Sequence, residues 1–98
     1  SIAISTAGKS PAFAKFLRRQ LQEQFGPEYG AMLDLMGAVR KRLLAQEHAP
    51  EQHKPLFEKL IQGGLLALIK GNDRQGINAL LASVLGPDFK YETMMETP

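Results

Sequence analysis

The sequence contains no cysteine, and this absence excludes several kinds of chemistry. Disulfide bonds, thiolate nucleophiles and cysteine-ligated zinc sites all require that residue. Long apolar runs are missing as well, since the longest, Leu65–Ile69, is far shorter than the roughly 20 residues of a membrane-spanning helix. We also find no signal-peptide pattern, and we therefore expect a cytoplasmic protein without a membrane partner.

The chain also lacks a large excess of charge of either sign, because 12 basic and 10 acidic side chains leave a net charge of only +2. The balance changes along the chain: residues 1–46 hold seven basic and three acidic side chains, whereas residues 47–98 hold five and seven. Such an asymmetry is typical either of a basic surface that binds an anionic partner or of solvated polar faces.

Two short units of the same pattern, Gly26-Pro27-Glu28-Tyr29 and Gly86-Pro87-Asp88-Phe89, are the most informative feature that is present. Glycine accepts the left-handed conformation that often ends a helix, and proline suits the first position of a new one. We interpret both units as helix-ending signals rather than as an internal duplication, since little beyond the four residues matches.

Apolar residues recur with helical spacing between these signals and predict four helices. The expected ranges are 11–25, 27–47, 55–70 and 73–85. Ser10 is a favourable N-cap for the first helix, and Asn72 with Gln75 has the spacing of a capping box for the fourth. The second helix is apolar around much of its circumference, as expected of a helix at the centre of a bundle.

The predicted fold class is all-α: a compact bundle of four short helices, or five if the glycine pair Gly63-Gly64 breaks the third. A close helix crossing is the other interpretation of that pair. We expect residues 1–9 to be a flexible lead-in, residues 10–87 a single helical domain and residues 88–98 a C-terminal tail.

Motifs for catalysis or metal binding do not hold up in this sequence. Residues 3–10 fit a loose nucleotide-binding loop, but the strand that should precede it and the other strands of a parallel sheet are absent. His48 and His53 are five residues apart in a proline-bounded linker, which is not the helical spacing of a zinc pair. We therefore predict no catalytic residue, no metal, no cofactor and no enzymatic activity.

The basic residues support one functional hypothesis. If the first two helices packed antiparallel, cations on the first would approach those at the end of the second. The candidate nucleic-acid-binding residues are Lys15, Arg18, Arg19, Arg40, Lys41 and Arg42. The corresponding function is a nucleic-acid-binding accessory domain with a basic patch, and a solvated basic face is the other interpretation.

Surplus apolar residues support the leading hypothesis. Four short helices bury every large apolar side chain only with difficulty, and methionine suits adaptable contact surfaces. The candidate partner-binding residues are Met32, Leu35, Met36, Leu66 and Ile69. The sequence thus predicts a non-enzymatic interaction module, an adaptor or oligomerisation domain, that binds a protein or itself; a well-filled core is the other interpretation.

Overall fold

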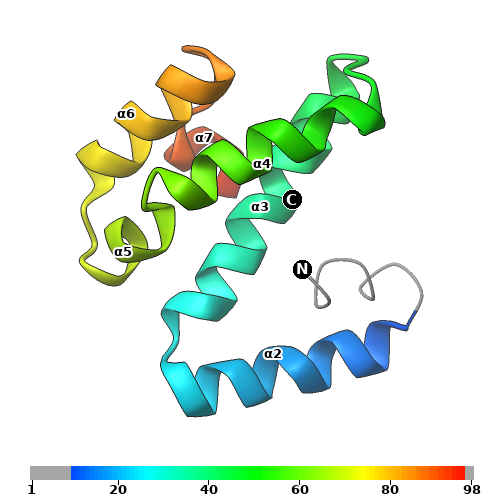
Figure 1. The fold of residues 1–98 in the computed structure, drawn as a ribbon, viewed down its shortest axis with the longest axis vertical. Coiled ribbons are helices and arrows are strands. Elements are labelled where there is room, and N and C mark those ends of the chain that lie inside the picture. The colour runs from blue at the N-terminus through cyan, green and yellow to red at the C-terminus, as the bar shows by residue number, and fades with distance from the viewer. Residues whose placement is uncertain (1–9, 97–98) are drawn as a thin grey trace.

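The computed structural model describes residues 10–96, which form helices joined by short connections (Figure 1). In chain order the elements are α2 (Pro11–Phe25), α3 (Glu28–Ala45), the 3₁₀ helix η1 (Pro50–Gln52), α4 (His53–Gln62), α5 (Leu65–Lys70), α6 (Arg74–Leu85) and α7 (Tyr91–Glu96). The prediction of an all-α bundle is confirmed. The predicted lead-in, residues 1–9, lies outside the described residues. So does the stretch that fits a loose nucleotide-binding loop, residues 3–10, except for Ser10. No helix in residues 10–96 is long and apolar enough to cross a membrane.

Both glycine-proline units end helices, as predicted. Gly26 follows α2 with a φ of 117°, and Gly86 follows α6 with a φ of 112°. Side chains with a Cβ rarely adopt such positive values, so glycine is the residue that suits these two positions. At the other end of α2, the Ser10 hydroxyl accepts a hydrogen bond from the Phe13 amide at 3.3 Å.

The second helix is shorter than predicted, and the third is two helices. Glu47 has a left-handed φ of 61°, which takes the chain out of α3 soon after Ala45. Gly64 has a φ of 88° and separates α4 from α5. A Cβ on Gly63 would lie 2.6 Å from the Leu80 Cδ1 of α6, so this glycine also allows α4 and α6 to approach closely.

The cap of α6 differs from the predicted one. The Asp73 carboxylate, not the Asn72 amide, caps the helix by accepting a hydrogen bond from the Gly76 amide at 2.9 Å. Asn72 has a φ of 53° and belongs to the turn that ends α5. The prediction was therefore wrong by one residue, because asparagine suits both a cap and a left-handed turn position.

The core lies around α3, which packs against α2, α4, α5 and α7, so its predicted central place is confirmed. Buried apolar residues from five elements and one connection make up one cluster. Its members are Leu35, Val39, Leu43, Leu60, Leu65, Ile77, Leu81, Phe89 and Met94. Phe89 and Met94 come from the last ten described residues, so this end of the chain is packed against the core.

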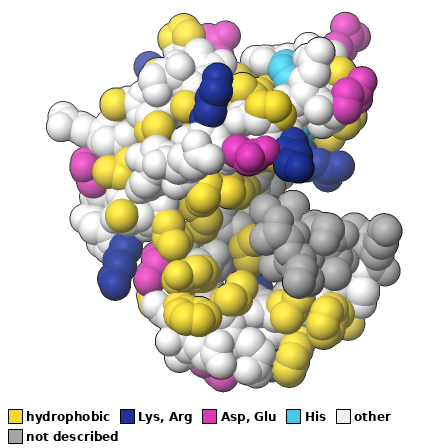
Figure 2. Space-filling model, in the orientation of Figure 1, with side chains coloured by type: hydrophobic (Ala, Val, Ile, Leu, Met, Phe, Trp, Pro, Cys, Tyr) yellow, Lys and Arg dark blue, Asp and Glu magenta, His cyan; other side chains and the backbone are white. Residues whose placement is uncertain are grey.

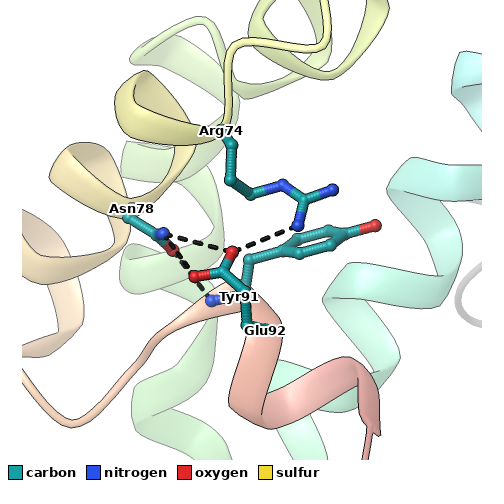
Figure 3. Close-up of polar contacts among 4 residues, drawn as sticks. All are labelled: Arg74, Asn78, Tyr91 and Glu92. Carbon is teal, nitrogen blue, oxygen red and sulfur yellow. Dashed lines mark hydrogen bonds and ion pairs between the residues drawn. The ribbon is translucent and has the colours of Figure 1, made fainter.

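A polar network fixes α7 to α6 (Figure 3). The Asn78 side chain accepts a hydrogen bond from the Tyr91 amide at 2.8 Å and donates one to the Glu92 carboxylate at 2.9 Å. Arg74 forms an ion pair with Glu92 at 3.1 Å, and its guanidinium lies 3.8 Å from the centre of the Tyr91 ring. Asn78 and Arg74 of α6 thus hold the first turn of α7 in place.

Candidate functional site

The apolar face of α2 is exposed to solvent instead of being packed in the core. α2 diverges from α3 at the corner between the two helices (Figure 1). None of the residues of α2 is buried. Phe13, Phe16 and Phe25 are 45%, 51% and 54% exposed, and the first two rings stack with their centres 6.3 Å apart. Apolar side chains gather on this part of the molecule in the space-filling view (Figure 2).

Two contacts hold α2 at its corner with α3. Arg18 donates two hydrogen bonds to the Asp34 carboxylate, at 2.6 and 2.7 Å, and these raise the pKa of Arg18 above its ordinary value. The Phe25 and Tyr29 rings lie with their centres 5.2 Å apart. The bidentate geometry orients α2 although the pair is solvent-exposed. The exposed aromatic face is therefore held in a defined position.

Sequence reasoning missed this face as a candidate site. The helical spacing of Phe13, Phe16 and Phe25 predicts one apolar face of the helix, but we did not propose this face as a binding surface. Periodicity identifies which residues share a face, but not whether another element of the same chain covers it. No signal in the sequence distinguishes the two cases.

The predicted partner-binding residues lie mostly inside the molecule. Leu35 is fully buried and Met36 is 4% exposed. Met32 and Ile69 are half-buried and pack against the core cluster, and Leu66 is half-buried. The apolar surplus of α3 is thus accommodated by the four elements that pack against it, because α3 is central. Binding of a partner through the exposed parts of these residues stays a prediction.

The predicted basic residues are not gathered by helix packing. α2 and α3 diverge instead of lying antiparallel, so the cations of α2 do not return towards the end of α3 (Figure 1). Arg18 is occupied by Asp34, and Arg42 lies over the Phe89 ring at 5.8 Å. Lys15, Arg19, Arg40 and Lys41 are exposed. Binding of nucleic acid by these residues stays a prediction.

The two histidines are packed against each other. The His48 and His53 ring centres are 5.0 Å apart, and His53 is 4% exposed with its Nε2 at 3.3 Å from the His48 carbonyl oxygen. The edge of the His53 ring also meets Phe57. Among the described residues, no group of three or more metal-ligating side chains comes together. The histidines therefore serve the packing of the α3–α4 connection.

Comparison with known proteins finds similarity to sirohaem biosynthesis proteins. Residues 1–24 match the family model described as "Sirohaem biosynthesis protein central". Of this match, the structure describes Ser10 and nearly all of α2, whose last residue is Phe25. No solved structure matches the chain.

The curated relatives are named siroheme synthases, and the similarity extends well beyond α2. One from Actinobacillus succinogenes is 25% identical over 89 residues, which are 91% of this chain and 19% of the relative. One from Neisseria meningitidis serogroup C is 26% identical over 89 residues, 91% of this chain and 18% of the relative. Siroheme synthase 2 of Yersinia enterocolitica is 32% identical over 74 residues, 76% of this chain and 16% of the relative. The chain thus spans less than a fifth of the length of these relatives.

These comparisons correct the functional predictions. The predicted function, a non-enzymatic interaction module or a nucleic-acid-binding accessory domain, is wrong, and so is the prediction of no enzymatic activity. The chain is similar to part of a synthase along most of its length. The prediction failed because it rested on the absence of catalytic motifs, and the sequence corresponds to only a small part of the related enzymes.

Proposed function

We propose that this chain is part of an enzyme of the siroheme synthase type and contributes a helical region to that enzyme. The observation that carries the proposal is the similarity to a siroheme synthase over 91% of the chain. The fold supports it, because the residues from α3 to α7 enclose a core of their own and so can form one structural unit within a longer protein.

The second part of the proposal concerns α2. The family match covers residues 1–24 and ends one residue before α2 does, whereas the core lies in the elements that follow. The exposed phenylalanine face belongs to the matched part. We infer that α2 packs against the region that precedes this segment in the longer protein. Three large aromatic side chains that are about half exposed are otherwise unfavourable in water.

A chimera tests the proposal. The aligned segment of the Neisseria meningitidis siroheme synthase is replaced by the corresponding residues of this chain, and the chimera is expressed in a bacterial strain that lacks its own siroheme synthase. Siroheme is then extracted and quantified by absorbance. We expect siroheme to form, because a segment with the same structural role should restore the whole enzyme.

A core variant of the same chimera is the matched control. Leu81 is fully buried, so Leu81→Asp places a charge in the core and should abolish siroheme formation. A chimera that accumulates as a folded protein but forms no siroheme would contradict the proposal. The predicted cytoplasmic location and the predicted protein partner or self-association stay predictions.

A further inference from the structure

A cavity between α3 and α7 is not used by the proposed function. Its volume is about 440 Å³, within the range of about 300 to 1,000 Å³ that is typical of small-molecule sites. The residues that line it are Gly37, Ala38, Lys41, Arg42, Ala45, Gln46 and Met94. All but two lie on α3, at positions that share one side of the helix; Gln46 follows the end of α3, and Met94 lies on α7.

The lining combines apolar walls with positive charge. Ala38, Ala45 and Met94 supply apolar surface, and no carboxylate is among the lining residues that the structure describes. Lys41 and Arg42 supply the charge. The Arg42 guanidinium lies 5.8 Å from the centre of the Phe89 ring, and this ring is only 2% exposed. A fixed ring under a guanidinium limits its freedom, so the cation is partly positioned before anything binds.

Gly37 is an exposed helical glycine in the wall of this cavity. Glycine in a helix interior costs about 1 kcal/mol relative to alanine. A Cβ at Gly37 would meet nothing within 4 Å, so the packing of the described residues does not require a glycine here. Because glycine has no side chain, this part of the cavity wall stays open.

We propose that this cavity binds a small amphipathic organic anion. The apolar body would lie against Gly37, Ala38 and Met94, and the anionic group would lie towards Lys41 and Arg42. Such a ligand matches both the apolar walls and the charge, because charge-assisted hydrogen bonds to the Arg42 guanidinium favour an anion over a neutral group of the same shape. The proposal does not depend on the siroheme synthase relationship.

The test uses octanoate and its neutral counterpart octanamide as probes. Both are titrated into the 98-residue chain, and the Met94 methyl signal is followed by NMR. We expect octanoate to shift this signal in a saturable manner and octanamide to bind at least about tenfold more weakly, the ratio that one charge-assisted hydrogen bond supplies. Equal binding of the two probes, or a Met94 signal that octanoate does not move, would overturn the proposal.

Two pairs of variants locate the site. Gly37→Leu fills the cavity and should abolish octanoate binding, whereas Ala82→Leu, which adds the same side chain on the exposed side of α6, should not. Arg42→Gln should weaken binding about tenfold, whereas Arg40→Gln on the same helix, outside the lining, should not. Lys41→Gln provides a second test if Arg42→Gln perturbs the fold. Binding that survives Gly37→Leu unchanged would overturn the assignment to this cavity.

Discussion

Leu81 lies on α6 with none of its surface exposed, and its contacts come from the cluster around α3. Replacing a buried leucine with alanine removes apolar contacts and leaves a cavity, which costs about 2–5 kcal/mol. We therefore expect Leu81→Ala to lower the free energy of unfolding by that amount, as measured by urea denaturation. Leu44→Ala is the control, because Leu44 is 42% exposed, and it should cost less than about 1 kcal/mol. Equal losses would show that the core is not where the structure has it.

Gly37 and Gly76 are both helical glycines, but they have opposite surroundings. Gly37 has open space around a Cβ, so Gly37→Ala should raise the free energy of unfolding by about 0.5–1 kcal/mol. A Cβ on Gly76 would lie 2.5 Å from the Asp73 carboxylate that caps α6 and 2.7 Å from the Leu68 Cδ2, so Gly76→Ala should be destabilising. Urea denaturation of both variants checks the two signs, and a loss of stability in Gly37→Ala would contradict this description of α3.

Residue chemistry predicted some of these positions and not others. The glycines before Pro27 and Pro87 end helices because their backbone requirement is local. The cap of α6 was placed at Asn72 instead of Asp73, because two adjacent residues had similar capping propensity and only the turn geometry separates them. The central burial of Leu35 and Met36 depends on which elements surround α3, and a single sequence does not contain that information.

At the scale of elements, α7 is held by Glu92. Hydrogen bonding from Asn78, followed by the ion pair with Arg74, lowers the pKa of Glu92 below its ordinary value. A carboxylate with a lowered pKa stabilises the fold above its unfolded-state pKa, and this stabilisation is lost as the pH falls through the folded-state pKa. Stability should therefore decrease with acidification, partly because α7 loses this attachment.

Glu92→Gln tests this attachment. The variant should be less stable than the parent at pH 7, and the difference should be smaller at pH 3, because protonation of Glu92 in the parent increases as the pH falls through its folded-state pKa. Urea midpoints at the two pH values provide the measurement. Glu58→Gln on the exposed side of α4 is the control and should leave the pH dependence nearly unchanged. A Glu92→Gln effect that is the same at both pH values would show that charge does not hold α7.

For α2, we predict that a substitution on the exposed face has different effects on the stability of the isolated chain and of the chimera. Phe16 is 51% exposed, so Phe16→Ser should change the unfolding free energy of the isolated chain by less than about 0.5 kcal/mol. In the chimera, the same change should lower the melting temperature, because the face would be covered there. Phe89→Ser, at a residue 2% exposed, should destabilise both proteins.

The outcomes for α2 are distinct. If Phe16→Ser leaves the melting temperature of the chimera unchanged, the preceding region does not cover this face. If the isolated chain forms a dimer that Phe16→Ser dissociates, as measured by light scattering, a second copy covers it instead.

Helices were predictable where the apolar periodicity extended over several turns or where a local glycine signal marked a helix end. The range of α2 agrees with the expected one, and Gly63-Gly64 correctly marked an interruption. α7 has six residues, too few for its periodicity to be recognised, and it forms here because Met94 is buried and Asn78 holds its first turn. Short elements of this kind depend on packing rather than on propensity.

At the scale of the whole molecule, the fold class followed from the sequence and the function did not. Helical periodicity and the lack of strand patterns are properties of the segment itself. Under the proposed function its role belongs to a longer protein, because the chain spans at most 19% of the first relatives it matches. The absence of catalytic motifs in this chain says nothing about the chemistry of the rest of those relatives.

Siroheme formation by the chimera tests the central claim most directly. The relationship to siroheme synthases predicts that cells whose siroheme synthase carries this segment accumulate siroheme, and that the Leu81→Asp version does not. A soluble, folded chimera that yields no siroheme, beside an unmodified Neisseria meningitidis enzyme that does, would contradict it.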